Sequence, residues 1–256
     1  RHESAFVKRS VVIRLLTAIV VVPPLLALVW HPALKSWFAL FVGLLAAVGL
    51  YEYYAIVRAR AISPETIGGI LAGALAAISG SIGSLTATSL MLYGGCLLVS
   101  ALHIVRGHHS VAGLSSSIFG VFYIGWLSAH ILLLHAEPVV GPALVTLLLV
   151  TVILTDTMAY VVGSLIGRHK LAPKVSPKKT WEGSISGFLS ALLGSAVLWK
   201  LASTPHGHGL PDWSLATYLS TGAVLSLAAQ IGDLTESCLK RDAGVKDSGN
   251  LFPGHG

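Results

Sequence analysis

Polar side chains recur at helical spacing near the end of an apolar stretch late in the chain. Steps of four, three, four and three residues separate Ser226, Gln230, Asp233, Ser237 and Lys240. On a helix this spacing places them on one face. A carboxylate in such a helix is costly unless it faces a protein cavity. We therefore interpret Asp233 as part of a functional site, in preference to a structural ion pair with a nearby Lys or Arg.

A second carboxylate lies in an earlier apolar stretch. Asp156 shares a helical face with Tyr160, Gly163 and Gly167, and the two glycines leave room beside it. Carboxylates close to several cations suit a metal–nucleotide complex, because Mg²⁺ prefers one or two carboxylates together with phosphate oxygens. We predict Asp233 as a metal ligand and Asp156 as a second candidate. For Asp156, an ion pair that stabilises the bundle is the open alternative.

A basic segment with phosphate-binding character separates two apolar stretches. Residues 176–183 read Ser-Pro-Lys-Lys-Thr-Trp-Glu-Gly. Ser followed by Pro is a typical helix start, so we expect Ser176 as the N-cap and Pro177 in the first turn. The backbone N–H groups of such a start can bind an anion. Lys178 and Lys179 would bind phosphate groups, although either lysine could instead be ordinary cytoplasmic charge.

The final segment, residues 244–256, is polar and rich in glycine. Such a loop can wrap phosphates closely. It is not a P-loop, because His255 stands where that motif has its lysine. Lys240, Arg241 and Lys246 are predicted to bind the phosphates that a metal leaves uncovered.

The composition indicates a membrane protein. The chain has 256 residues, 54% of them hydrophobic and 11% charged, whereas a soluble domain carries roughly 25% charged residues. So few charges cannot cover a globular surface in water, and lipid must cover much of it. We predict an all-α polytopic bundle forming one integral membrane domain, residues 1–256. Its eight predicted membrane helices lie near residues 11–30, 36–57, 66–83, 87–105, 111–134, 140–166, 183–202 and 213–239.

The distribution of Lys and Arg predicts the orientation of the chain. With the N-terminus in the cytoplasm and alternating sides, only Lys35 and Lys200 of the 17 Lys and Arg residues lie outside. Basic loops stay on the cytoplasmic side of membrane proteins, so the two motif segments are predicted to share that side and to converge there. The same rule accounts for the net charge of +6 without a nucleic-acid partner.

The motif segments resemble the phosphatidate cytidylyltransferase (CDP-diacylglycerol synthase) family. That family's C-terminal signature has a serine, Lys-Arg, Lys-Asp and Pro-Gly-His-Gly-Gly, followed by Asp-Arg-x-Asp. Matching positions here are Ser237, Lys240-Arg241, Lys246-Asp247 and Pro253-Gly254-His255-Gly256. The block from Ser176 to Gly183, Asp156 with Ala159-Tyr160, and Gly232-Asp233-Leu234 are also similar. The resemblance covers residues 156–256, the predicted catalytic region. The second Gly and the Asp-Arg-x-Asp element would follow Gly256, so we expect a longer natural protein with a ninth helix.

The resemblance implies a reaction between CTP and phosphatidic acid that gives CDP-diacylglycerol and pyrophosphate, on the cytoplasmic face of a bacterial inner membrane. It implies Mg²⁺ as cofactor, with a second cation and a homodimer left open. The implied catalytic residues are Asp233, Ser237, Lys240, Arg241, Lys246 and Asp247. The implied substrate-binding residues are Ser176, Lys178, Lys179, Thr180, Glu182 and His255. The implied metal ligands are Asp233 and Asp156.

Two other functions are open on the sequence alone. An ion-coupled secondary transporter would also place acids in membrane helices, but its sites lie near the bilayer midplane and it often has an inverted repeat. A CTP-dependent lipid kinase would use the same nucleotide and release CDP. The acids here lie near cytoplasmic helix ends and no repeat is visible, so the cytidylyltransferase interpretation is preferred.

Overall fold

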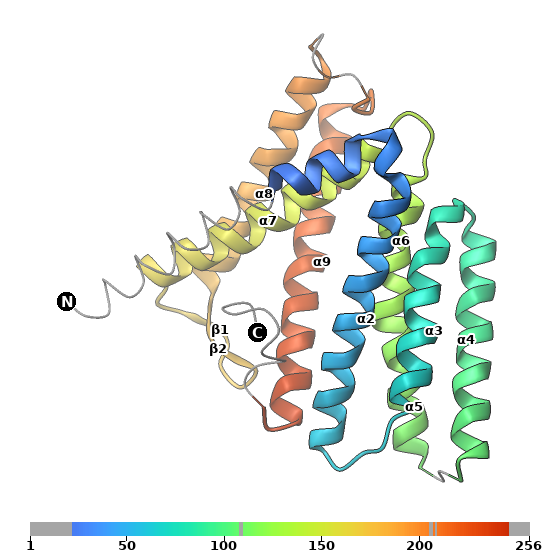
Figure 1. Ribbon diagram of the computed structural model, residues 1–256. Coiled ribbons are helices and arrows are strands. Elements are labelled where there is room, and N and C mark those ends of the chain that lie inside the picture. Colours follow the sequence, from blue (N-terminus) through green and yellow to red (C-terminus); the bar gives the residue numbers. More distant parts are fainter. Residues whose placement is uncertain (1–21, 108–109, 205–206, 208, 246–256) are drawn as a thin grey trace. The chain divides into compact units, whose positions relative to one another are not determined.

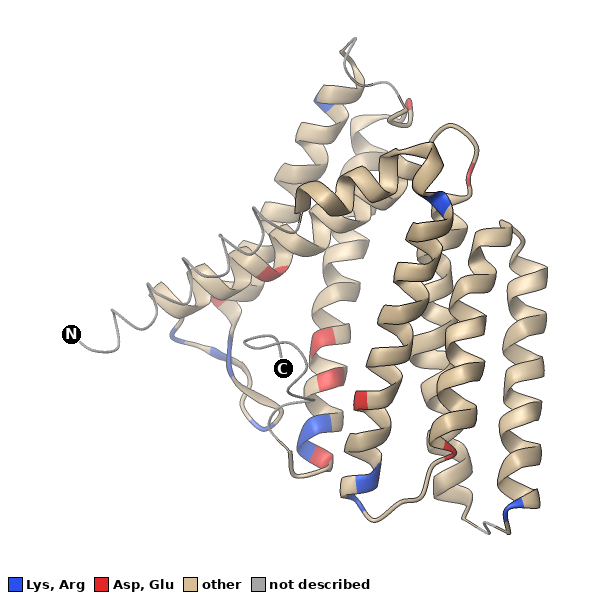
Figure 2. Cartoon of the chain, in the orientation of Figure 1, with Lys and Arg blue, Asp and Glu red and all other residues tan. Residues whose placement is uncertain are grey.

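The structure is a computed structural model that describes residues 22–107, 110–204, 207 and 209–245 (Figure 1). Within these residues, six helices are long and apolar enough to cross a membrane. They are Pro32–Ala59, Leu85–Val105, Val111–His135, Gly141–Ile166, Trp181–Ala202 and Leu215–Asp242. The chain is therefore an all-α polytopic membrane protein, as its composition predicts. Charged residues gather mainly near helix ends and in one hairpin (Figure 2).

Six of the eight predicted stretches correspond to these spans. The third, near residues 66–83, forms the shorter helix α3 (Thr66–Ser79) and the 3-10 turn η2 (Gly80–Ile82). Of the first, near residues 11–30, residues 22–30 are helical and the rest lies outside the described residues. Eight spans and a ninth beyond Gly256 therefore stay predictions.

The described chain divides into two compact units. One contains Pro142–Cys238 with residues 22–32, and the other contains Ala33–Gly141 with residues 239–245. Each unit has its own buried cluster of apolar side chains. The single integral membrane domain over residues 1–256, with its catalytic region 156–256, stays a prediction.

The unit of residues 33–141 is a helical bundle. Its helices are α2 (Lys35–Ala59), α3, α4 (Leu85–Val105) and a continuous run of α5 (Val111–Gly120), the π-helical η3 (Val121–Trp126) and α6 (Leu127–His135). A Cβ on Gly125 of η3 would clash with the backbone of Gly73 of α3. Gly69 lies against the Tyr54 ring, whose hydroxyl donates to the Ser117 carbonyl at 2.8 Å. Gly69 and Gly73 of α3 thus allow close packing between helices.

One end of this bundle carries most of its charge. Glu65, just before α3, is 1% exposed, and its Oε2 lies 2.7 Å from Nη1 of Arg106, the residue after α4. The Glu65 Oε1 is 3.7 Å from Nδ1 of His103. Arg58 of α2 donates to Thr66 at 2.7 Å at the same end. The opposite end of α2 begins at Lys35.

The unit of residues 142–238 joins helices through a small hairpin. Its helix α7 (Gly141–Ile166) leads to β1 (Lys170–Ala172) and β2 (Ser176–Thr180), and then to α8 (Trp181–Ala202) and α9 (Leu215–Asp242). The two strands are antiparallel, with Lys170 opposite Thr180 and Ala172 opposite Ser176. The backbones of α7 and α8 approach closely, since a Cβ on Gly183 would clash with the carbonyl of Ala159. This packing places the end of β2 beside α7.

Candidate functional site

The two segments predicted to converge meet through an ion pair. Lys179 of β2 has its Nζ 2.5 Å from Oδ2 of Asp233 on α9. The Lys179 side chain is 23% exposed and the Asp233 side chain 51% exposed. The carboxylate is therefore accessible to a ligand, while the ammonium is held within the fold. The spatial prediction for these two residues is confirmed.

The hairpin that carries Lys179 differs from the helix start predicted for residues 176–183. Residues 176–180 form strand β2, and α8 begins at Trp181. Thr180 is the N-cap: its backbone is extended, and its hydroxyl accepts from the Gly183 N–H at 3.2 Å. The prediction of Ser176 as N-cap is wrong, because pairing with β1 keeps Ser176 extended and Thr180 supplies the cap three residues before Gly183. Pro177 is tolerated because a two-stranded sheet has only edge strands.

The base of the hairpin is fastened to α8 by Glu182. The His169 N–H donates to both carboxylate oxygens, at 3.2 and 3.3 Å, and Nδ1 of the His169 ring lies 2.7 Å from Oε1. The Trp181 N–H also donates to the His169 carbonyl at 2.9 Å. Glu182, implied by the resemblance to bind substrate, thus has both oxygens engaged in holding the hairpin. His169 was not assigned a role from the sequence.

Alternation along β2 separates the two lysines of the basic motif. Neighbouring residues on a strand point to opposite faces. Lys178 is exposed and Lys179 is half-buried against Asp233. Thr180, the next residue, is buried and caps α8. Strand β2 therefore directs Lys179 toward α9 and leaves Lys178 exposed.

A set of hydrogen bonds links α7, α8 and α9 next to this ion pair. The Ser184 hydroxyl of α8 donates to the Gln230 side-chain carbonyl of α9. The Gln230 amide donates to the Ser226 hydroxyl at 3.4 Å, and the Thr155 hydroxyl of α7 donates to Ser226 at 2.9 Å. Thr155 and Ser226 are fully buried. The predicted polar face of α9 therefore faces protein at Ser226 and Gln230, and Asp233 follows one turn beyond Gln230.

Comparison with known proteins adds an independent line. The family model described as "Cytidylyltransferase family" matches residues 12–256. The chain belongs to the cytidylyltransferase family. It is 33% identical over 243 residues to "Phosphatidate cytidylyltransferase" of Brucella abortus, covering 95% of this chain and 84% of the relative. It is 32% identical over 251 residues to the protein of the same name from Synechocystis sp., covering 87% and 83%. Arabidopsis thaliana "Phosphatidate cytidylyltransferase 4, chloroplastic" is 34% identical over 244 residues, covering 82% and 59%.

Of the other two acids assigned from the sequence of this cytidylyltransferase-family chain, the structure describes Asp156. Asp156 follows Thr155 on α7 and is exposed. Within the part of the chain that the structure describes, three or more His, Cys, Asp and Glu side chains nowhere cluster to hold a metal ion. Asp247, with Lys246 and His255, lies outside the described residues. A metal here would therefore draw on one or two carboxylates, the number that Mg²⁺ commonly uses.

The last turns of α9 continue the polar face beyond Asp233. Ser237 follows one turn later, and Lys240 and Arg241 stand in the final turn. Cations there are favoured by the negative end of the helix dipole, so a structural contribution accompanies any contact with phosphate. The Val245 N–H caps the helix by donating to the Lys240 carbonyl at 3.0 Å.

Proposed function

We propose that this chain is a phosphatidate cytidylyltransferase, which transfers CMP from CTP to phosphatidic acid and releases pyrophosphate. The observation that carries the proposal is the Lys179–Asp233 pair, which joins the two motifs of the resemblance at one accessible carboxylate. The curated relatives that bear this enzyme's name support it across most of the chain.

The chemistry requires little of the protein beyond positioning and charge. A phosphate oxygen of phosphatidic acid forms a bond to the α-phosphorus of CTP, and the bond from that phosphorus to the bridging oxygen of the β-phosphate breaks. The nucleophile is already an anion, so no general base is needed. The residues must hold crowded negative groups in line and offset their charge. We assign Lys178, Lys179, Lys240 and Arg241 to phosphate oxygens, with Lys246 as a further predicted contact.

We propose Mg²⁺ as the cofactor, with Asp233 as a ligand and Asp156 as a second candidate. The accessible Asp233 carboxylate fits an ion that takes one or two carboxylates and completes its shell with water and phosphate oxygens. When bound, Mg²⁺ supplies a Lewis acid and a template for the phosphates. With Asp233 engaged in this way, the Lys179 ammonium is available to a phosphate oxygen. Ser237, Ser176, Thr180, Glu182, Asp247 and His255 keep the roles that the resemblance implies as predictions.

We propose an inner-membrane protein with a cytoplasmic N-terminus, eight spans in this chain and a cytoplasmic site. The split of Lys and Arg between the sides supports this orientation. CTP then arrives from the cytoplasm, and phosphatidic acid enters sideways from the bilayer, because its acyl chains leave hydrocarbon only at high cost. The homodimer is a separate prediction, tested by light scattering on the purified protein.

The experiment that tests the function uses the natural protein in phosphatidic acid-containing vesicles with CTP labelled in its α-phosphate. We expect label to move into a CDP-diacylglycerol product and pyrophosphate to appear in equal amount. A CTP-dependent lipid kinase would release labelled CDP and leave the lipid unlabelled. A transporter would do neither, so either result would overturn the proposal.

A further inference from the structure

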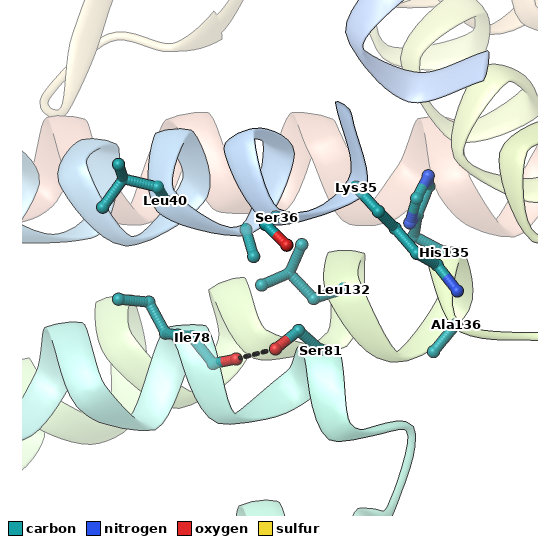
Figure 3. Close-up of a pocket in the computed structure, with 9 residues that line it drawn as sticks. Lys35, Ser36, Leu40, Ile78, Ser81, Leu132, His135 and Ala136 are labelled. Carbon is teal, nitrogen blue, oxygen red and sulfur yellow. Dashed lines mark hydrogen bonds between the residues drawn. The ribbon is translucent and has the colours of Figure 1, made fainter. Parts of the chain in front are cut away.

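A cavity in the bundle of residues 33–141 has no part in the reaction proposed above. Its volume is about 370 Å³, and it lies among α2, the α3–η2 segment and the end of α6 (Figure 3). Sites for small ligands generally measure about 300–1,000 Å³. The cavity is therefore large enough for a lipid head group and the first carbons of its acyl chains.

The polar residues of the cavity all stand at helix ends. Lys35 and Ser36 are the first residues of α2, Ser81 belongs to η2, and His135 is the last residue of α6 (Figure 3). His135 is 6% exposed, and its ring centroid lies 4.8 Å from that of Phe38. The cap position of α2 makes no side-chain hydrogen bond to the first turn. The Ser81 hydroxyl donates to the Ile78 carbonyl at 2.8 Å (Figure 3). This end of the cavity therefore offers the Lys35 ammonium and the Ser36 hydroxyl to an anion.

The apolar residues of the cavity lie further along the same helices. Leu40 lies one turn after Ser36 on α2 (Figure 3). Ile78 lies about one turn before Ser81, and Leu132 about one turn before His135. The lining thus changes from polar residues at the helix ends to apolar residues one turn further into the bundle. A phospholipid has the same order of chemistry, with a phosphate at the membrane surface and hydrocarbon below it.

Two further features place the polar end at a membrane surface. Trp37, next to Ser36, is 62% exposed, and exposed tryptophans in membrane proteins gather at the head-group level. Lys35 is also one of only two Lys and Arg residues predicted outside, at the end of α2 opposite Arg58. With the predicted orientation, Lys35 and the polar end of the cavity face the outer leaflet.

We propose that this cavity binds the phosphate group of an anionic phospholipid from the outer leaflet, with Lys35 as its main electrostatic contact. The Ser36 hydroxyl donates to the phosphate, and the walls at Leu40 and Leu132 receive the upper acyl chains. A net anion is selected because the polar end carries a lysine and, among the described residues that line it, no carboxylate. The bound lipid bridges α2 and α6 and stabilises the bundle.

The test measures lipid binding to the purified natural protein in neutral detergent, without CTP. Phosphatidylglycerol, phosphatidylcholine with the same acyl chains, and inorganic phosphate are added separately and followed by native mass spectrometry and thermal melting. We expect phosphatidylglycerol to bind and raise Tm, and phosphatidylcholine to bind more weakly. Lys35→Gln should weaken phosphatidylglycerol binding by about tenfold, as loss of one charge-assisted contact does. Lys200→Gln, the other predicted outside cation, is the matched control and should bind as the wild type.

A second variant tests the cavity separately from the charge. Leu40→Trp fills the space while leaving Lys35 in place, and it should also lose phosphatidylglycerol binding. Equal binding by wild type and both variants would overturn the site. Saturation by inorganic phosphate that excludes the lipid would show a free-anion site and overturn the lipid assignment. Since no nucleotide is present, these outcomes do not depend on the transferase activity.

Discussion

The ammonium of Lys179 and the carboxylate of Asp233 lie 2.5 Å apart, on a strand and a helix that are distant in the sequence. Lys179 is largely buried, but the Asp233 side chain is half exposed, so solvent weakens the pair toward the roughly 0–1 kcal/mol that exposed ion pairs contribute to stability. Stability alone therefore gives little reason to hold an acid at this place in a membrane helix. A ligand-binding role for the Asp233 carboxylate would explain its position.

Asp233→Asn should separate the functional role from the structural one. The variant keeps the shape of the side chain but loses the charge that would hold Mg²⁺. We expect it to fold with an unchanged Tm and to lose activity on the order of 100-fold, the effect typical of removing one charge-stabilising group. Added Mg²⁺ should restore activity only in part. The measurement is a Mg²⁺ titration of CDP-diacylglycerol formation with thermal melts alongside.

A matched control for this variant is Asp242→Asn. Asp242 forms an exposed pair with Arg60, 3.6 Å apart, at the end of the same helix, and its loss should leave activity within about twofold. An Asp233→Asn protein with normal Mg²⁺ dependence but a lowered Tm would remove Asp233 from the metal site.

Exchanging the charges of the pair gives a sharper test of Lys179. The single variants Lys179→Asp and Asp233→Lys each leave like charges together and should be inactive. The double variant restores an ion pair, so a structural pair would regain most of the activity. We expect the double variant to stay inactive, because the carboxylate that would bind a metal and the ammonium that would bind a phosphate have exchanged places. As a separate comparison, Lys178→Met, on the other face of the strand, should retain more activity than Lys179→Met. Recovery of activity in the double variant would contradict our assignment.

Helix positions could be predicted from the sequence because lipid imposes a strong requirement. An apolar run of about 20 residues has few alternatives to a membrane helix, and the stretch near 140–166 is α7, Gly141–Ile166. The polar face of α9 followed from helical period alone, since Ser226 and Gln230 both turn toward protein.

Local structure outside lipid was less predictable. The Ser-Pro pair of the basic motif has the residues of a helix start, but a strand at residues 170–172 pairs with it and moves the start to Trp181. Sequence spacing does not reveal such pairing. Thr155 and Ser184 were missed because single hydroxyls among small residues are usual in membrane helices, and only the fold brings them to Gln230 and Ser226. Proximity of Asp156 to Asp233 could not be judged from helical period, which is defined within one helix.

The predicted orientation can be checked at two positions on either side of α8 in the sequence. Lys174, in the hairpin turn, and Ser203, just after the helix, are both exposed. Single cysteines at these positions should react with a membrane-impermeant maleimide from opposite sides, Lys174→Cys from the cytoplasm. Cys238 is exposed, so the background must carry Cys96→Ser and Cys238→Ser. Labelling of both cysteines from one side would show that α8 does not span the membrane as proposed.

Gln230→Leu tests whether the hydrogen bonds between helices position Asp233. Gln230 joins Ser184 of α8 to Ser226 of α9, so its loss leaves partly buried hydroxyls without that amide and should lower stability by about 1–2 kcal/mol. Because α9 then loses its register against α8, we expect kcat to fall and the KM for CTP to rise even at temperatures where the protein stays folded. Thr235→Ala is the matched control, since the Thr235 hydroxyl donates to the Ile231 carbonyl of its own helix at 2.9 Å. Gln230→Glu, which keeps the acceptor oxygen for Ser184, should recover part of the activity. If Gln230→Leu lowered Tm but left kcat and KM unchanged below the transition, the bonds would stabilise the bundle without positioning the carboxylate.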